Sequence, residues 1–452
     1  MINYIKGNGK FPSYSEALHL FDMVNQVKFV HSPKIRQNVD KERVVYVDVT
    51  QFAKQGFQTG IQRVVNAFIE FAPNHKFIFF KNGAYYEFNA LNQRKLQKRS
   101  KLILLIEKVY KYFSRIIYSK EFKKKSKIIR EQLFNFLYFG VKKIDTEDLI
   151  SASLFIPDLP SERSHLEAIL CLGAFTNINL SIFVHDMIPI THPELMPTNS
   201  TNEFNLYAKI LLNADKIFCA SNYVKKTYLG YRKMNSEFKS KQRVYVRPFP
   251  QFLQNENNEL QNVSSKFRKF LGKDDYILAV GTIFPRKNLS LLVRALKILE
   301  DNNISCNLII LAHGNWQDYG FDLACKSLRL NKVSIYYNSN DSELVYAYKN
   351  SLALGFPSLA EGFGLPVIES LSYNKITIVN NIEPMRSLSS SKNLRKVDNY
   401  AVNWANEIIR IIDTKDKTSK LAFEEITNNS SRKVLKLKEK EWVQNLITLV
   451  SN

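Results

Sequence analysis

The chain is dominated by two series of short apolar segments that alternate with stretches of helical periodicity. The first series comprises 44–49, 76–80, 85–88, 154–156, 180–184, 216–220 and 244–246. A polar link follows at 251–264, and the second series comprises 276–280, 307–311, 333–337, 352–356 and 376–379. Such alternation is typical of parallel sheets covered by helices on both faces, so the sequence predicts an α/β fold with two doubly wound domains. Ligands of such sheets bind beyond the carboxyl ends of the strands, which predicts a cleft between the domains.

The length of 452 residues is more than one hydrophobic core usually serves, which agrees with two domains. We expect an N-terminal extension over 1–42, an N-terminal Rossmann-like domain over 43–255 and a C-terminal Rossmann-like domain over 265–430. The last segment, 431–452, is expected to be a helix that could pack back on the N-terminal domain.

Positive charge is concentrated in one segment of the N-terminal half. The whole chain has a formal net charge of +22, and residues 94–143 contain 16 Lys or Arg and 3 Glu, a net charge of +13. This segment is predicted to form a cationic amphipathic helix or helix pair. Its apolar face could pack on the protein, lie in an anionic membrane interface, or bind a partner. Its aromatic side chains mingle with the aliphatic ones and no nucleic-acid motif is present, so nucleic acid is not an expected partner.

Four cysteines are widely spaced and no C-x-x-C pair occurs, which argues against a zinc site or a disulfide framework. The first residues do not have the pattern of a signal peptide. No uncharged apolar run reaches the roughly 20 residues of a membrane-spanning helix. The sequence therefore predicts a cytoplasmic protein, with the basic segment as a possible site of peripheral contact with the inner face of the plasma membrane.

A loop rich in functional residue types follows the segment 352–356, in the sequence Glu361-Gly-Phe-Gly-Leu-Pro-Val-Ile-Glu369. Proline suits the first turn of a helix, so the helix is predicted to begin near Pro366. The backbone amides of Phe363, Gly364 and Leu365 would then face an anion such as a phosphate. Glu361 and Glu369 flank this point and would accept hydrogen bonds from sugar or ribose hydroxyls. Glycine, proline and glutamate are also ordinary between a strand and a helix, so the spacing alone leaves a purely structural role open.

A second group of candidates follows the first strand of the C-terminal domain. Gly281 ends this strand and would let a ligand or another backbone segment come close. Arg286 and Lys287 would place two positive charges at the same sheet edge as Glu361, a pairing suited to a diphosphate.

The N-terminal domain contributes further candidates. His185 and Asp186 end the segment 180–184 and are expected to face the cleft, although the histidine could equally be satisfied by local backbone. Gly60, at the first strand-to-helix turn, would allow close approach of donor phosphates.

These motifs resemble the retaining glycosyltransferases of family 4, which have the GT-B fold of two Rossmann-like domains. Two motifs carry the resemblance strongly, Glu361-Gly-Phe-Gly-Leu-Pro-x-x-Glu369 and Val280-Gly-Thr-x-x-x-Arg286-Lys-Asn. His185-Asp-x-Ile-Pro and Thr59-Gly-Ile-Gln-Arg63 are similar to those of mannosyltransferase-type members that build bacterial surface polysaccharides. The likeness is strong over 275–380 and weak over 43–250.

The resemblance implies an enzyme that transfers a hexose, with mannose as the best guess, from a nucleotide diphosphate sugar to a lipid-linked or glycan acceptor of O-antigen or capsule. It implies that Arg286 and Lys287 bind the donor diphosphate, that Glu361 contacts the sugar and that Glu369 contacts the ribose. The N-terminal domain would be the acceptor side, with His185 near the sugar. Family members need no metal, and this chain contains no Asp-x-Asp motif, so we expect no metal and no cofactor besides the donor.

Two departures limit the comparison. Family members usually have Pro-Glu followed by glycine after the strand that matches 376–379, whereas this chain has Asn381-Ile-Glu-Pro-Met-Arg386 and a serine run. The basic segment 94–143 is also longer than the family core needs. The alternative function is a non-catalytic GT-B protein that binds a nucleotide sugar or a membrane.

Overall fold

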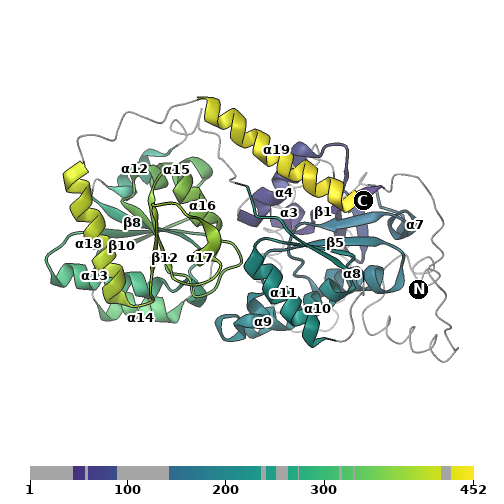
Figure 1. Cartoon of the computed structure of the whole chain (residues 1–452), viewed down its shortest axis with the longest axis horizontal. Coiled ribbons are helices and arrows are strands. Elements are labelled where there is room, and N and C mark those ends of the chain that lie inside the picture. The colour runs from purple at the N-terminus through teal and green to yellow at the C-terminus, as the bar shows by residue number, and fades with distance from the viewer. Residues whose placement is uncertain are drawn as a thin grey trace, which may run out of the picture.

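The structure is a computed structural model that describes residues 44–55, 60–88, 142–235, 241–250, 263–272, 274–314, 318–328, 331–418 and 429–451. The predicted N-terminal extension, most of the basic segment 94–143 and most of the polar link lie outside the described residues. The described chain forms two α/β lobes, each built on its own sheet (Figure 1).

The N-terminal domain is built on a seven-stranded sheet with the order β3-β2-β1-β4-β5-β6-β7. Its strands are β1 (Val45–Asp48), β2 (Lys76–Lys81), β3 (Ala84–Glu87), β4 (Ser153–Ile156), β5 (Asn179–Val184), β6 (Lys216–Cys219) and β7 (Arg243–Val246). Its helices are α3 (Thr50–Gln55), α4 (Gly60–Phe71), α7 (Thr146–Ile150), α8 (Arg163–Phe175), α9 (Ile188–Thr191), α10 (Thr198–Asn213) and α11 (Asn222–Met234), with a 3-10 turn η1 (Pro193–Leu195).

The C-terminal domain has a six-stranded sheet with the order β10-β9-β8-β11-β12-β13. Its strands are β8 (Tyr276–Gly281), β9 (Asn307–Ala312), β10 (Val333–Tyr337), β11 (Ala353–Phe356), β12 (Ile376–Asn380) and β13 (Leu394–Val397). Its helices are α12 (Ser265–Leu271), α13 (Leu289–Asp301), α14 (Tyr319–Ser327), α15 (Asp341–Asn350), α16 (Leu365–Ser372), α17 (Met385–Leu388) and α18 (Ala401–Thr418), with a 3-10 turn η4 (Pro285–Lys287).

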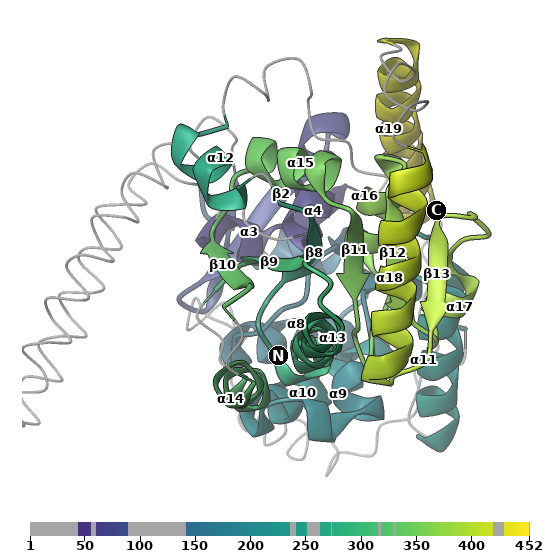
Figure 2. The same ribbon diagram turned by 90° about the vertical axis from the view of Figure 1, so that its left-hand side faces the viewer.

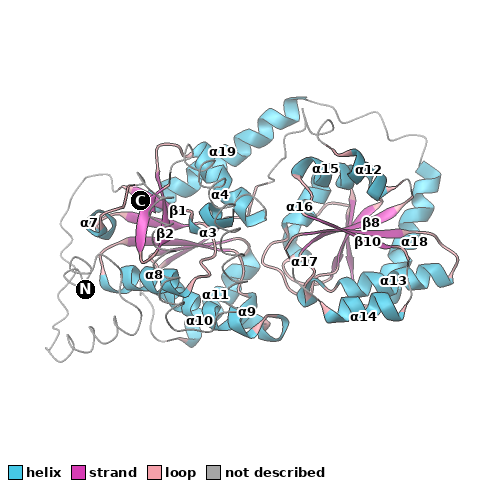
Figure 3. Ribbon diagram, turned by 180° about the vertical axis from the view of Figure 1, so that it is seen from behind, coloured by secondary structure: helices cyan, strands magenta, loops and turns pink. Residues whose placement is uncertain are grey.

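Each sheet has helices on both faces, as the alternating apolar pattern predicts. In the C-terminal domain, α12 and α15 cover one face while α13 and α14 cover the other (Figure 2). These faces enclose two separate hydrophobic cores, one around Phe267 and Tyr348 and the other around Leu292 and Trp404. The view from behind shows the same layering in both lobes (Figure 3).

Two features of the sheets differ from the prediction. The prediction of purely parallel sheets is wrong for β3, which pairs antiparallel with β2 because the chain returns through the tight turn at Asn82 and Gly83. Strand β13 was not expected, since Arg395 and Lys396 interrupt its apolar run. It is an edge strand that pairs only with β12 among the described strands, so its charged side chains stay near solvent.

The last helix, α19 (Asn429–Ser451), crosses from the C-terminal lobe to the N-terminal domain (Figure 1). Val443, Leu446 and Val450 are fully buried in the same core as Phe68 of α4. The Nζ atom of Lys216 in β6 donates a hydrogen bond to the carbonyl of Val450 at 2.9 Å. Helix α19 therefore forms part of the hydrophobic core of the N-terminal domain.

Candidate active site

The carboxyl ends of β8 and β11 hold four of the candidate residues. Gly281 ends β8 with φ +136°, a conformation that side-chain-bearing residues rarely adopt. The turn η4 then presents Arg286 and Lys287, and Glu361 follows β11. The backbone amide of Leu359 donates to the carbonyl of Arg286 at 2.8 Å, which fixes the two loops side by side.

Glu361 is buried and paired with both cations. Its Oε1 atom lies 2.8 Å from Nη1 of Arg286 and 2.5 Å from Nζ of Lys287. Burial by itself would raise the pKa of this carboxyl, but the charges of Arg286 and Lys287 outweigh it and hold the pKa at about 2. Glu361 is therefore ionised at every physiological pH.

The side chain of Lys287 is only 12% exposed, and its ammonium lies over the ring of Phe356. Burial lowers the pKa of Lys287 to about 8, because desolvation and the neighbouring Arg286 outweigh the attraction of Glu361. The sequence predicted two positive charges at the same sheet edge as Glu361. The structure brings both cations into one compact cluster with this carboxylate.

The amino end of α16 lies beside this cluster. Gly364 is the N-cap residue, with φ +96° and no side-chain hydrogen bond to the first turn. Phe363 is buried and packs edge-on against Phe249 of the N-terminal domain, with ring centroids 5.2 Å apart. Leu365 begins the helix and Pro366 follows in its first turn. A helix N-terminus without a side-chain cap, next to Arg286 and Lys287, has the electrostatics of an anion site.

Glu369 is buried one turn further along α16 and is held from two sides. The hydroxyl of Tyr348 donates to its Oε2 atom at 2.9 Å. Its Oε1 atom accepts a hydrogen bond from Nη1 of Arg63, which belongs to the N-terminal domain. The carboxylate is thus fixed in place at the boundary between the domains.

His185 and Asp186 lie at the carboxyl end of β5, on the opposite side of that boundary. The Nε2 atom of His185 is 2.7 Å from the carbonyl oxygen of Pro157, so Nε2 is the protonated nitrogen and Nδ1 is the acceptor. Burial lowers the pKa of His185 to about 4, so the ring is neutral at pH 7. Nδ1 is buried and has no hydrogen-bond partner among the residues that the structure describes, which leaves it able to accept a bond from a ligand hydroxyl.

Asp186 has a local structural contact as well as an electrostatic one. Its Oδ1 atom accepts a hydrogen bond from the amide of Ile188 at 3.1 Å, at the start of α9. Burial raises the pKa of Asp186, while the charge of Arg286 opposes that rise. Asp186 therefore lies within the field of the Glu361 cluster.

The loop that contains Glu361 touches the N-terminal domain directly. A Cβ atom at Gly362 would overlap the backbone carbonyl of His185 and come within 2.7 Å of Cβ of Asp186. The hydroxyl of Ser221, the N-cap residue of α11, donates to the carbonyl of Gly362 at 2.7 Å. Neither residue was among the sequence candidates, because a contact between two distant loops leaves no local pattern.

Gly60 lies at the first residue of α4, and its structural contribution is to start the helix that presents Arg63. The other candidates gather around the boundary between the two lobes. Arg63 was not a predicted site residue. It ends the motif Thr59-Gly-Ile-Gln-Arg63, and the family resemblance of this motif was the one signal in the sequence that pointed to it.

A cavity of about 290 Å³ opens beside this site. His192 and Tyr223 line it from the N-terminal domain. Leu359, Ala360, Ile382, Glu383 and Arg386 line it from the C-terminal domain. Glu383 and Arg386 lie in the loop that departs from the family pattern, so this chain has its own lining there.

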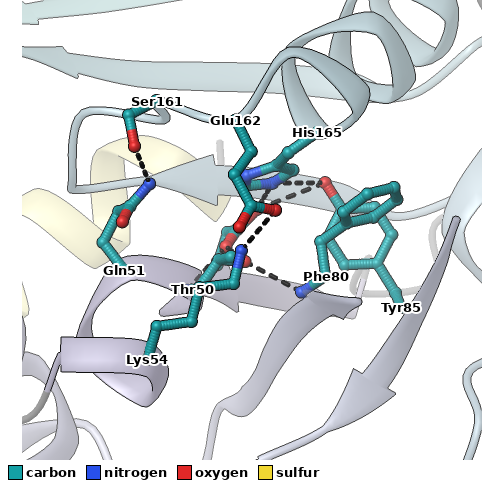
Figure 4. Close-up of polar contacts among 9 residues, drawn as sticks. Thr50, Gln51, Lys54, Phe80, Tyr85, Ser161, Glu162 and His165 are labelled. Atoms are coloured by element: carbon teal, nitrogen blue, oxygen red, sulfur yellow. Dashed lines mark hydrogen bonds and ion pairs between the residues drawn. The ribbon is translucent and has the colours of Figure 1, made fainter. Parts of the chain in front are cut away.

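A buried polar cluster supports the N-terminal side of the site (Figure 4). The Oδ2 atom of Asp48, at the end of β1, is 2.7 Å from Nε2 of His165 and 3.2 Å from the hydroxyl of Tyr85. Its Oδ1 atom accepts from the amide of Thr50 at 2.9 Å and from its hydroxyl at 2.5 Å. The cluster fixes the start of α3, and α3 leads into the segment before Gly60.

Among the described residues, no group of three or more His, Cys, Asp and Glu side chains could hold a metal ion. Within the same part of the chain, no helix combines the length and the apolar character needed to span a membrane.

The C-terminal domain is similar in sequence to a known family. Residues 262–424 match the family described as glycosyl transferases group 1. The chain is 27% identical over 261 residues to the serotype-specific mannosyltransferase WbdA of Escherichia coli, which is 53% of this chain and 30% of that protein. It is 30% identical over 151 residues to the O-antigen chain mannosyltransferase RfbU of Salmonella typhimurium, which is 33% of this chain and 41% of that protein. The chain thus spans less than half the length of these relatives.

Solved structures show the same architecture over about nine-tenths of the chain. An α,α-trehalose-phosphate synthase from Burkholderia xenovorans superposes with a TM-score of 0.55 at 11% identity, over 91% of this chain and all of that one. Sucrose-phosphate synthase from Thermosynechococcus elongatus superposes with a TM-score of 0.51 at 14% identity, over 90% of this chain and 96% of that one. These likenesses confirm the predicted GT-B fold of two Rossmann-like domains. The C-terminal domain of this chain therefore resembles the glycosyl transferases group 1 family over 262–424, within a GT-B fold.

Proposed function

We propose that the chain is a glycosyltransferase that moves a hexose from a nucleotide diphosphate sugar to a lipid-linked or glycan acceptor. The observation that carries this proposal is the buried cluster of Glu361, Arg286 and Lys287 beside the uncapped start of α16. Two fixed cations and a helix N-terminus stabilise the charge that develops on a departing diphosphate. They are already in place, so little reorganisation is needed during the reaction.

The carboxylate next to these cations has a separate role. When a diphosphate enters, Arg286 and Lys287 gain a second anionic partner, and Glu361 can turn one oxygen to the hydroxyls of the sugar. Glu361 remains ionised because its pKa is about 2, so it acts as an acceptor of hydrogen bonds and not as a proton donor. Glu369 would accept from the ribose in the same way, and the amides of Phe363, Gly364 and Leu365 would face the phosphates.

The acceptor side is assigned to the N-terminal domain. His185 is neutral at pH 7, and its Nδ1 atom would accept a bond from a sugar hydroxyl, while Nε2 bonds to the carbonyl oxygen of Pro157. Asp186 lies near the site, where the charge of Arg286 opposes the rise of its pKa by burial. In this proposal no protein nucleophile is needed. The acceptor oxygen bonds to the anomeric carbon on the face from which the diphosphate departs, and an oxygen of the leaving phosphate takes the acceptor proton. The new bond replaces the broken one on the same face, so the configuration is retained. No metal and no further cofactor take part.

Mannose is the proposed sugar because the relatives with matching sequence are named as mannosyltransferases. The same names favour a role in bacterial O-antigen synthesis, with capsule as the related possibility. An acceptor on a lipid carrier would place the protein at the inner face of the plasma membrane. The basic segment 94–143 is the proposed contact with an anionic surface.

The proposal is tested by screening nucleotide sugars for binding and slow hydrolysis. Release of GDP or UDP from one donor by the wild type, lost in Glu361→Gln and Arg286→Gln, is the expected result. Lys297→Gln is the matched control, since this lysine pairs only with Glu300 and Asp301 of its own helix among the described contacts. Binding of a donor without transfer to any lipid-linked or glycan acceptor would favour the alternative, a non-catalytic nucleotide-sugar-binding protein. A protein that binds no nucleotide sugar would refute the proposal.

A further inference from the structure

Arg63 joins the two domains through one side chain. It lies in the first turn of α4, and its Nη1 atom bonds Oε1 of Glu369 in α16. Its Nη2 atom lies 3.1 Å from Oδ1 of Asp341, the first residue of α15. The planar guanidinium thus contacts two carboxylates of the C-terminal domain at once, which a lysine ammonium does less well. Figure 1 and Figure 3 show α4 facing α16 across the boundary.

The surroundings of Arg63 make this contact electrostatically important. The side chain is only 14% exposed, and that of Glu369 is 10% exposed. Burial and then the charge of Arg63 lower the pKa of His313, just beyond β9, so the guanidinium influences a third element. Without Arg63, Glu369 would be buried near Asp341 with no counter-charge from the opposite domain, and an uncompensated buried charge is costly.

We infer that Arg63 is a positioning residue that couples donor binding to domain closure. It orients Glu369 from the opposite domain and holds the two domains together around the nucleotide site. An ionised carboxylate has about four acceptor positions, so Glu369 can keep its bonds to Arg63 and Tyr348 and still accept a ribose hydroxyl. The inference rests on the proposed function, because it takes Glu369 as a contact of the donor nucleotide.

The first test concerns the domains and needs no donor. Small-angle scattering of the ligand-free protein is compared for the wild type, Arg63→Gln and Arg63→Lys. We expect a larger radius of gyration for Arg63→Gln and a value closer to the wild type for Arg63→Lys. Arg163→Gln is the matched control, because the Arg163 side chain is 77% exposed and pairs with Glu167 of its own helix at 3.0 Å.

The second test concerns the nucleotide. The dissociation constants of GDP and UDP are measured by calorimetry, and the donor KM and kcat follow for whichever donor the wild type hydrolyses. Arg63→Gln should weaken the nucleotide that binds the wild type by about tenfold, since a misplaced Glu369 loses one charge-assisted hydrogen bond. The donor KM should rise by a similar factor while kcat changes by less than about threefold, because the Glu361 cluster stays intact.

A second variant keeps the inference testable if Arg63→Gln does not fold. It weakens the contact between Arg63 and Asp341 at its more exposed partner. Asp341→Asn removes one of the two carboxylates, and Asp341 is 46% exposed. Asp341→Asn should also increase the radius of gyration and the dissociation constant of the nucleotide, each by less than Arg63→Gln does. Expansion without a loss of nucleotide affinity, or a loss of affinity without expansion, would overturn the coupling. A wild type that binds no nucleotide would refute the proposed function, while the scattering comparison would still decide whether Arg63 joins the domains.

Discussion

Gly362 in the C-terminal domain and His185 in the N-terminal domain lie so close that no side-chain carbon fits between them. A Cβ atom at Gly362 would overlap the carbonyl oxygen of His185 and the backbone around it. These atoms are the carbonyl group of His185 and the Cβ of Asp186, which are fixed to the main chain and cannot move aside as the end of a flexible side chain does. The two loops that carry Glu361 and the His185–Asp186 pair can therefore meet only because residue 362 is glycine.

Gly362→Ala should keep the domains from closing and reduce donor hydrolysis by more than about tenfold, because misplacement of about 1 Å at a reacting centre is costly. Both domains should stay folded, since the clash lies between them. Hydrolysis and thermal unfolding are measured together. Gly230→Ala is the control, because a Cβ at this α11 position meets no atom within 4 Å. Activity of Gly362→Ala equal to that of the control would contradict the closed arrangement.

The lowered pKa of Lys287 predicts that kcat/KM for the donor falls at alkaline pH. Burial lowers the pKa of Lys287 to about 8, and the protonated form is the one that attracts the diphosphate. The value of kcat/KM, which reports the free enzyme, should therefore fall as pH rises through about 8. Lys287→Arg should lose this limb, because arginine stays charged throughout the range. The same alkaline limb in both proteins would show that another group is responsible.

The buried pair of Asp48 and His165 predicts a pH-dependent contribution to stability. Burial by itself would raise the pKa of Asp48, but the contacts with His165 and Thr50 lower it overall. A carboxyl whose pKa is lower in the folded state stabilises the protein above its unfolded pKa of about 3.9, and this stabilisation is lost as pH falls through the folded value.

Asp48→Asn should therefore lower the free energy of unfolding by about 3 kcal/mol near neutral pH, the size expected for breaking a buried pair. The difference from wild type should shrink in acid, as measured by denaturant unfolding at several pH values. Asp145→Asn is the control, since Asp145 caps α7 at an exposed site and asparagine is an equally good cap. A constant difference at every pH would refute the role of the Asp48 charge.

The buried side chains of α19 predict that the N-terminal domain depends on this helix for its stability. Leu446 is fully buried against the core that contains Phe68 and Phe155. Leu446→Ala should lower the free energy of unfolding by roughly 2–5 kcal/mol through the lost apolar contact and the cavity that remains. Leu437→Ala is the control in the same helix, because Leu437 is 49% exposed. Equal effects of the two substitutions would mean that α19 does not pack as described.

The alternating apolar segments were sufficient to predict both sheets, because each buried strand requires a continuous apolar run in the sequence. The apolar pattern did not predict strand β13, since it lies at an edge of the sheet where Arg395 and Lys396 can reach water. The antiparallel direction of β3 was not predicted either, because apolar periodicity does not distinguish a parallel strand from an antiparallel one.

The candidate residues of the C-terminal domain were visible in the sequence for a local reason. Arg286, Lys287, Glu361 and Glu369 each lie within a few residues of a strand end or a helix start, and such junctions have recognisable glycine and proline patterns. The sequence could therefore indicate which residue types meet at one sheet edge. It could not show that Glu361 binds both cations, because that pairing depends on the distance between two loops.

By itself the sequence determined the two α/β domains, the glycine and proline positions of the site and the residue types that surround it. These properties follow from backbone preferences and burial along the chain. The tertiary structure alone decided that Arg63 bonds Glu369, that Gly362 meets His185, that Lys287 is buried enough to have a lowered pKa, and that α19 completes the first domain. Each of these depends on segments far apart in sequence, and only packing of the two domains brings such groups within contact distance.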